Sequence, residues 1–221
     1  MKTPVFALCL LALLTGGLAH AQETGDVVMH REVLALENRW AEIRYEMKGR
    51  GEKFAAGRDL MRDATALAER HPGKAEPLVW EALALLVEAE LRGDLSALSL
   101  ARNARDLLHQ AEAIDPAAAN GLIQTSLGML YYEMPSWPLG FGDKKKAEVY
   151  LTQALAIDPE GMDSNYFYGD FLLQGGRKRE ALPYLDRAMH AAALVRPGHE
   201  RATAGRKIDI QEALDSARKA R

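Results

Sequence analysis

The chain has 221 residues, of which 48% are hydrophobic, so it is long enough to bury a sizeable core in one folded unit. Its 28 lysine and arginine residues against 31 acidic residues give a net charge of −3, which provides no electrostatic case for binding nucleic acid or an anionic membrane. The one cysteine, Cys9, lies in the apolar N-terminal stretch, so disulfides and thiol catalysis are excluded from the rest of the chain.

Residues 1–21 have the features of a secretory signal peptide. Lys2 precedes an apolar run over residues 5–14, and the triplet Ala-His-Ala at 19–21 places small residues on both sides of a cleavage point. The run spans about 10 residues, short of the roughly 20 that a bilayer-spanning helix needs. We expect cleavage after Ala21 with no membrane span left behind, and the lack of disulfide-forming cysteines favours a bacterial periplasm.

Beyond residue 21, apolar residues recur at helical spacing in every long segment, and none shows a sustained two-residue alternation. The sequence ARDLLHQAEAIDP of residues 104–116 returns as AEVYLTQALAIDP in residues 147–159. A further copy, ALPYLDRA in residues 181–188, follows at a spacing of 34 residues, the period of tetratricopeptide repeats (TPR). The chain therefore resembles that family, and we expect an all-α fold.

The resemblance rests on small residues where the two helices of a repeat cross, with one large apolar residue filling the space between neighbouring pairs. The matching positions are Gly169, Gly176, Ala181, Leu185 and Ala188 in one repeat, and Gly128, Ala147, Leu151, Ala154 and Pro159 in the repeat before it. The resemblance implies a TPR-like stack of about three and a half antiparallel helix pairs, an α-α superhelix, with residues 22–221 as a single domain. The best repeats are 76–116, 118–159 and 160–193.

Other parts of the chain fit the repeat less well. Residues 33–72 are interpreted as a degenerate first repeat, with its first helix over residues 33–47 and glycines 49, 51 and 57 loosening the connection that follows. In the next repeat we expect a long connection over residues 91–104, LRGDLSALSLARNA. Residues 199–221 are expected to form a C-terminal capping helix. Its predicted apolar face consists of Ile208, Ile210, Leu214 and Ala217.

The stretch MPSWPLGFGDKKKA, residues 134–147, interrupts the third repeat. Pro135 prevents the preceding helix from continuing, and Pro138 prevents a new helix from starting before it. Residues 134–142 are therefore expected to leave the stack as a loop. Asp143 can then accept hydrogen bonds from the free amides at the start of the next helix.

Three large apolar side chains of this loop, Trp137, Leu139 and Phe141, are expected to fold back onto the protein, because leaving each in water forgoes about 1.5 to 3 kcal/mol. Two interpretations remain open. The side chains plug the edge of the repeat stack as a self-packed loop. Alternatively, they wall one side of a pocket together with Tyr131, Tyr132, Tyr166 and Tyr168.

The segment SNYFYGDFLL, residues 164–173, concentrates further aromatic residues on one helix. Because the first helix of each pair lines the concave face in repeat proteins of this type, Asn165 and Tyr168 could hydrogen-bond a peptide or small ligand there. The alternative is that Tyr166 and Phe167 pack in the core while Asn165 satisfies a neighbouring backbone group. The candidate binding residues are Tyr131, Tyr132, Trp137, Phe141, Asn165 and Tyr168.

No enzyme signature is present. The mature chain lacks a cysteine, a G-x-S-x-G elbow, an H-E-x-x-H motif and a glycine-rich phosphate loop, so we expect no catalytic residues, no metal and no cofactor. The scattered histidines form no metal-spaced pair. Basic turns at residues 143–146 and 177–179 lie on one side of the predicted stack, either as a solvated rim or as an edge that meets an acidic partner.

The sequence therefore predicts a periplasmic scaffold whose concave face binds a protein or peptide partner, with aromatic side chains as anchors. No nucleic-acid partner is expected, and the oligomeric state is left open. The loop and two repeats also resemble the helical periplasmic subunits associated with tripartite (TRAP) solute transporters. That resemblance implies an alternative, a small-ligand-binding accessory subunit of a transport system, in which the Trp137 loop is a lid.

Overall fold

The computed structural model describes the backbone of residues 9–219 and the side chains of residues 25–219 except that of Leu95. Over this range the chain is all-α, without a strand, as the sequence predicts. The elements are α1 (Cys9–Ala41), a π-helical turn η1 (Glu42–Glu46), α2 (Arg50–Arg70), α3 (Ala75–Arg92), α4 (Leu95–Ile114), a short turn η2 (Ala118–Gly121), α5 (Leu122–Glu133), α6 (Lys144–Ile157), α7 (Met162–Gln174), α8 (Lys178–Ala191) and α9 (Glu200–Arg218).

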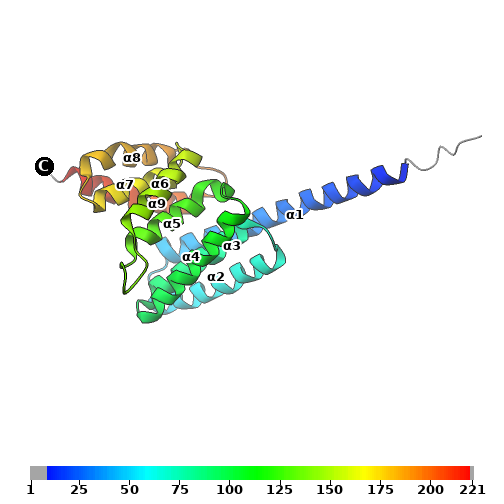
Figure 1. The fold of residues 1–221 in the computed structure, drawn as a ribbon, viewed down its shortest axis with the longest axis horizontal. Helices are drawn as coiled ribbons and strands as arrows, with labels where there is room; N and C mark the ends of the chain where they lie inside the picture. Colours follow the sequence, from blue (N-terminus) through cyan, green and yellow to red (C-terminus); the bar gives the residue numbers. More distant parts are fainter. Residues whose placement is uncertain (1–8, 220–221) are drawn as a thin grey trace, which may run out of the picture.

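The helices pack as successive antiparallel pairs (Figure 1). The described chain contains four pairs, α1 with α2, α3 with α4, α5 with α6 and α7 with α8, half a pair more than the sequence suggests. The predicted repeat 76–116 contains α3 and α4, and the predicted repeats 118–159 and 160–193 contain the next two pairs. The predicted capping helix is present as α9.

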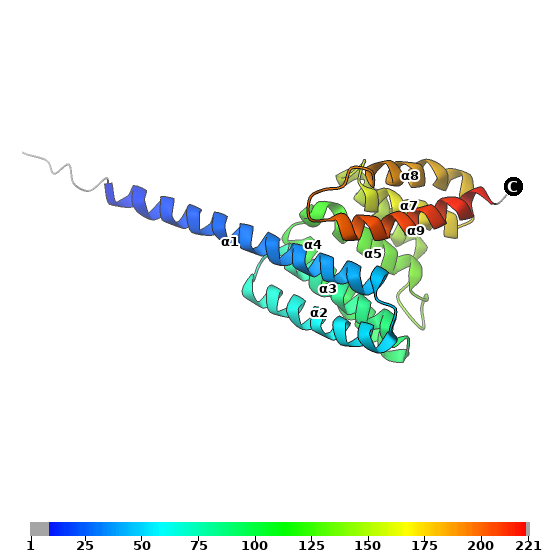
Figure 2. The same ribbon diagram turned by 180° about the vertical axis from the view of Figure 1, so that it is seen from behind.

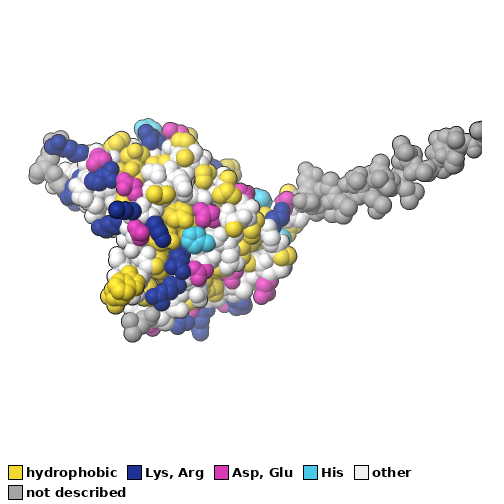
Figure 3. Space-filling view, in the orientation of Figure 1, with side chains coloured by type: hydrophobic (Ala, Val, Ile, Leu, Met, Phe, Trp, Pro, Cys, Tyr) yellow, Lys and Arg dark blue, Asp and Glu magenta, His cyan; other side chains and the backbone are white. Residues whose placement is uncertain are grey.

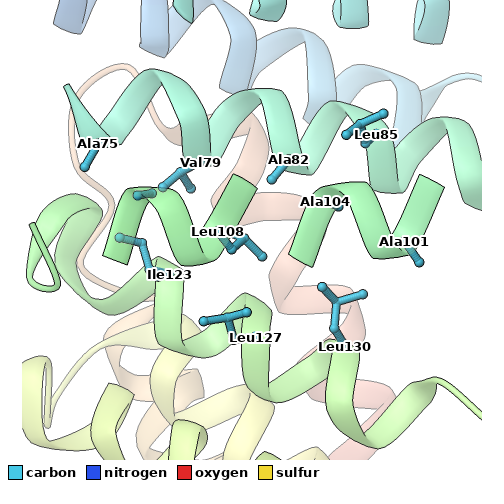
Figure 4. Packing of buried hydrophobic residues seen from close by; sticks show 11 residues of the cluster. Ala75, Val79, Ala82, Leu85, Ala101, Ala104, Leu108, Ile123, Leu127 and Leu130 are labelled. Atoms are coloured by element: carbon cyan, nitrogen blue, oxygen red, sulfur yellow. The ribbon is translucent and has the colours of Figure 1, made fainter. Parts of the chain in front are cut away.

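The core lies between neighbouring pairs and is made of aliphatic side chains with alanine between them. Figure 4 shows its central part, where Val79 of α3, Leu108 of α4 and Ile123 of α5 meet and each side chain is fully buried. Leu127 and Leu130 continue the same layer along α5. Helical spacing of these apolar residues therefore places one face of each helix against the next pair.

The predicted close approach of the two helices within a pair is confirmed. A β-carbon built on Gly128 of α5 would lie 2.5 Å from Cγ of Leu151 in α6, and one built on Gly169 of α7 would lie 2.8 Å from Cγ of Leu185 in α8. Because glycine has no β-carbon, the leucine side chain packs directly on the backbone of each glycine. The interruption between α5 and α6 does not alter this crossing.

The long connection expected over residues 91–104 is wrong, since only Gly93 and Asp94 separate α3 from α4. Gly93 adopts the left-handed conformation with φ of 62°, and the carboxylate of Asp94 accepts a hydrogen bond of 2.8 Å from the amide of Ser96. No helix-breaking residue follows. The extra residues therefore lengthen the two helices.

Two smaller expectations also fail. Gly57 does not loosen the first connection but lies inside α2, where a β-carbon would be 3.0 Å from Leu91 and 3.7 Å from Val87 of α3. On α9, Ile210, Leu214 and Ala217 are buried, whereas Ile208 is more than half exposed because it lies on the opposite side of the helix from Ile210.

Helix α9 does more than cover the last pair, because it also packs along α1 and α7 (Figure 2). Next to α9, the amide of Asn38 in α1 donates to the carbonyl of Gly198 at 3.0 Å, and the ring of His199 lies 2.8 Å from the carboxylate of Glu37. A β-carbon on Gly205 would overlap the ring of Tyr45 in η1. The C-terminal helix therefore joins the first and last helix pairs.

The N-terminal part of α1 extends away from this body in Figures 1 and 2. Residues 1–8 of the predicted signal peptide lie outside the described residues, and the predicted cleavage point after Ala21 falls within α1. Among the side chains that the structure describes, Met29 is the first buried one. None of the helices in the described part of the chain is both long enough and apolar enough to cross a bilayer.

Candidate functional site

The interruption between α5 and α6 is a loop over residues 134–143, as the proline positions predict. The predicted cap is confirmed, because Oδ1 of Asp143 accepts hydrogen bonds from the amides of Lys145 at 3.0 Å and Lys146 at 3.2 Å. The amide of Asp143 donates to the carbonyl of Tyr131 at 2.8 Å and so closes the loop at its base. Backbone hydrogen bonds thus fix where the loop leaves and re-enters the stack.

The three apolar side chains of the loop differ in their burial. Phe141 folds back as expected, with its ring 5.9 Å from that of Tyr131 in an edge-to-face arrangement and 4.6 Å from the guanidinium carbon of Arg105. The same expectation is wrong for Trp137 and Leu139, whose exposed fractions are 86% and 71%. Figure 3 shows the end of this loop as a hydrophobic projection from the body.

Glycines explain why the tip points outward. A β-carbon on Gly140 would overlap the carbonyl oxygen of Pro135, and one on Gly142 would overlap that of Met134. The two arms of the loop therefore pack backbone against backbone, which leaves no interior space for the side chains of its tip.

An outer hollow of about 520 Å³ lies beside the base of this loop, between α4, α5 and α6. Its floor is Tyr131 of α5, whose ring stacks on that of Tyr150 at 5.6 Å. The hydroxyl of Tyr131 lies 3.4 Å from Nε2 of His109, and the Lys146 ammonium lies 5.4 Å from the Tyr131 ring. The charged and aromatic residues that line it are His109, Glu112, Tyr131, Lys145, Lys146 and Tyr150.

Tyr132 follows Tyr131 in sequence but faces the opposite side of α5, toward α7. Its hydroxyl donates to Oδ2 of Asp170 at 2.7 Å, and the side-chain amide of Gln174 donates to the same oxygen at 2.8 Å. Asp170 belongs to an inner hollow of about 410 Å³ between α7, the start of α8 and α9. The polar and aromatic residues that line it are Tyr166, Asp170, Gln174, Lys178, Asp209, Glu212 and Ser216.

The inner hollow is lined by α7, the first helix of its pair, and by α9, which also packs on α1. Its environment favours neutral forms of the groups around it. Burial and then the charge of Asp170 raise the pKa of Tyr132 well above its ordinary value, and the same two causes raise the pKa of Tyr166. The pKa of Glu133 is raised by desolvation and then by repulsion from Asp170, although its side chain keeps contact with solvent.

Arg206 holds α9 as the wall of the inner hollow, and the sequence prediction missed it. Its buried guanidinium donates to Asp163 of α7 and to Asp209 of α9, both at 2.8 Å. It also lies 4.7 Å from the centre of the Phe167 ring and 4.9 Å from that of Tyr166. Burial opposes the charge of Arg206, but the carboxylates led by Asp163 outweigh it and raise the pKa of Arg206 above its ordinary value.

Asn165 and Tyr168, two of the six candidate residues, lie inside the last helix pair. Asn165 is fully buried, and its amide nitrogen donates at 2.8 Å to the carbonyls of both Pro159 and Gly161. Tyr168 is 8% exposed and packs edge-to-face on Tyr184 of α8 with ring centres 4.7 Å apart. Neither lines either hollow.

The other four candidates are divided between the two sides of the stack. Tyr131 and Phe141 lie at the outer hollow, Tyr132 lies at the inner one, and Trp137 covers neither. Among the residues that the structure describes, no group of histidine, cysteine and acidic side chains could hold a metal ion.

Comparison with known proteins finds a similar fold among solved structures. No protein-family model and no curated protein matches the sequence. The structure is similar to the crystal structure of a thermophilic TPR protein of Thermus thermophilus, with 20% sequence identity, a TM-score of 0.57, and coverage of 75% of this chain and 74% of that one. Four stacked helix pairs, glycine–leucine crossings and this similarity together show that the chain has a TPR-like fold.

Proposed function

We propose that this protein is an exported scaffold of the periplasm that binds a protein or peptide partner on its concave side, at the inner hollow. The TPR-like fold suggests a role in protein–protein interaction. Export is supported by the signal-peptide pattern of residues 1–21.

The observation that carries the proposal is the carboxylate of Asp170. It receives hydrogen bonds from the neutral donors Tyr132 and Gln174 and forms no ion pair with a described side chain, although Lys178 lines the same hollow. The hydroxyl and amide hold the carboxylate in position, while Glu133 and Glu212 add negative charge nearby. A fixed carboxylate without an ion pair, in a hollow that also contains the ring of Tyr166, is suited to a cationic group of the partner.

The ends of the helices reinforce this preference. Tyr132 and Glu133 belong to the last turn of α5, and Gln174 ends α7, so the negative ends of two helix dipoles meet at the hollow. The ring of Tyr166 supplies apolar and cation-binding surface beside the carboxylate. The partner is therefore a segment with lysine or arginine side chains.

The alternative is a small-ligand-binding accessory subunit of a solute transport system. The volumes of the two hollows, about 410 and 520 Å³, lie in the range typical of small-molecule sites. In that case a cationic small molecule would occupy the inner hollow. Trp137 would not act as its lid, because this side chain is 86% exposed and lines neither hollow.

Isothermal titration calorimetry on the mature chain tests the proposal. The probe is a 12-residue peptide rich in lysine and tyrosine, and the matched probe is the same peptide with every lysine acetylated. We expect the lysine peptide to bind and the acetylated one to bind at least tenfold more weakly. Asp170→Asn should weaken binding at least tenfold, whereas Glu69→Gln, which removes an exposed carboxylate from α2, should change it less than twofold.

Equal binding of both peptides, or no effect of Asp170→Asn, would refute cation recognition at this carboxylate. Native mass spectrometry of the protein purified from the periplasm tests the alternative. A small mass that is retained by the wild type and lost from Asp170→Asn would favour the accessory-subunit role. N-terminal sequencing of the same sample tests export, because we expect the mature chain to begin at Gln22.

A further inference from the structure

We propose that the loop tip and the outer hollow form a second interaction surface, on the opposite side of the stack from the inner hollow, that docks an acidic and apolar segment of a protein partner. The outer surface consists of the tip side chains Trp137 and Leu139, of Phe141 and Arg105 at the base of the loop, and of the charged and aromatic residues that line the outer hollow. It lies beyond the site proposed above and does not depend on it.

The exposure of the tip is fixed by the backbone. The amide of Gly142 donates to the carbonyl of Pro135 at 2.9 Å, and the amide of Gly140 donates to that of Ser136 at 3.2 Å. Any β-carbon at either glycine would overlap a carbonyl of the facing arm. A loop held in this way presents Trp137 and Leu139 already ordered, so little conformational entropy is lost when a partner buries them.

The tip and the outer hollow are joined by side-chain contacts. The guanidinium of Arg102 donates to the carbonyl of Leu139 at 3.4 Å, and Arg105 lies over the ring of Phe141. Phe141 contacts Tyr131, and Tyr131 stacks on Tyr150 in the hollow. Phe141, Tyr131 and Tyr150 therefore form an aromatic path from the base of the loop to the floor of the hollow, and Arg102 reaches the tip through the backbone of Leu139.

The charge beside this path is positive. Lys144, Lys145 and Lys146 form the first turn of α6, are all exposed, and make no ion pair with a described side chain. Arg102 likewise has no carboxylate partner among the described side chains, and Glu112 is the single acidic residue of the hollow. A partner must therefore supply carboxylates to match this surface, the reverse of what the inner hollow requires.

The shape favours a protein segment over a lipid surface. Lys145 and Lys146 line the hollow to one side of the tip, where the Lys146 ammonium lies 5.4 Å from the Tyr131 ring. A flat bilayer that met Trp137 and Leu139 would leave the hollow and its cations unfilled. A chain with apolar and acidic side chains can contact the tip and enter the hollow at once, and tryptophan and arginine are the residue types that anchor protein interfaces.

Selection from a displayed library of random 12-residue peptides on the mature protein tests the proposal. We expect enriched peptides that combine a net negative charge with at least two large apolar residues. Fluorescence anisotropy should show their affinity at least tenfold weaker for Trp137→Ala and for the double variant Lys145→Glu/Lys146→Glu. The matched control is Leu194→Ala, which removes another exposed leucine, from the α8–α9 connection, and should change affinity less than twofold.

Asp170→Asn separates this inference from the proposed function. It should leave the acidic peptides unaffected, whereas basic peptides lost only from Asp170→Asn would report the inner hollow. The inference is overturned when no enriched acidic peptide depends on Trp137. It is also overturned when phosphatidylglycerol vesicles, and no peptide, shift the tryptophan emission of the wild type to the blue and leave that of Trp137→Phe unchanged.

Discussion

The helix crossing at Gly128 gives a prediction whose sign depends on two opposed effects. Replacing this helical glycine with alanine should gain about 1 kcal/mol from helix propensity. The new β-carbon, however, would lie 2.5 Å from Cγ and 2.7 Å from Cδ2 of Leu151, and 3.3 Å from its backbone nitrogen. Because the branching carbon of Leu151 cannot swing away, α5 and α6 must separate, and such overpacking costs about 1 to 3 kcal/mol.

We therefore expect Gly128→Ala to lose up to about 2 kcal/mol, or up to about 8 °C in Tm for a chain of this size. At Gly169 the nearest atoms of Leu185 are 2.8 Å away, so Gly169→Ala should lose less. Gly51 of α2 has nothing within 4 Å, so Gly51→Ala should stabilise the protein by up to about 1 kcal/mol. Urea unfolding of the three variants measures this order. A Gly128→Ala variant as stable as Gly51→Ala would refute the close crossing.

Further predictions concern single side chains. Arg206→Met should lower the free energy of unfolding by about 3 to 5 kcal/mol in urea melts, because it leaves two carboxylates without their buried partner; a loss below about 1 kcal/mol would contradict the clamp on α9. Glu133→Gln should be more stable than the wild type at pH 7, and the difference should vanish below about pH 4. The reason is that the pKa of Glu133 is higher in the native than in the unfolded state, so the wild type loses stability as the pH rises above the unfolded-state pKa. A stability difference that does not depend on pH would contradict the raised pKa. Phe141→Ala should cost at least about 1 kcal/mol and Trp137→Ala less than about 0.5 kcal/mol in thermal melts, and equal losses would mean that the tip packs in solution.

The repeat architecture could be predicted because its determinants are local and periodic. Leu151 and Leu185 recur at the repeat spacing of 34 residues, and each packs on a glycine of its own helical hairpin, Gly128 or Gly169. The cap at Asp143 depends on the residues that immediately follow it. Such signals need no knowledge of how distant parts of the chain meet.

The contacts made by α9 could not be predicted in this way, because they join residues about 160 positions apart. Tyr45 and Asp209 are linked by a hydrogen bond of 2.8 Å, yet neither lies in a recognisable motif. One local signal was available: Arg206 stands at helical spacing from Ile210 and Ala213, so a charge occupies the apolar face of α9. A charged residue in such a stripe indicates a buried ion pair.

The loop shows a different limit. Hydrophobicity predicts that Trp137, Leu139 and Phe141 are buried, but it cannot decide which of them the backbone can turn inward. Tyr131 and Tyr132 likewise look like one aromatic pair in the sequence. Successive residues on a helix point about 100° apart. Tyr131 therefore contacts Tyr150 of α6, whereas Tyr132 contacts Asp170 of α7.

Nitrogen–proton correlation NMR of the mature protein, titrated with the lysine-rich peptide, tests the central claim most directly. We predict that the backbone amides of Glu133, Asp170 and Gln174 shift with the added peptide, while the indole signal of Trp137 and the amide of Lys145 stay unchanged. Shifts confined to Trp137 and Lys145, or an unchanged spectrum, would contradict a concave surface that recognises cationic segments.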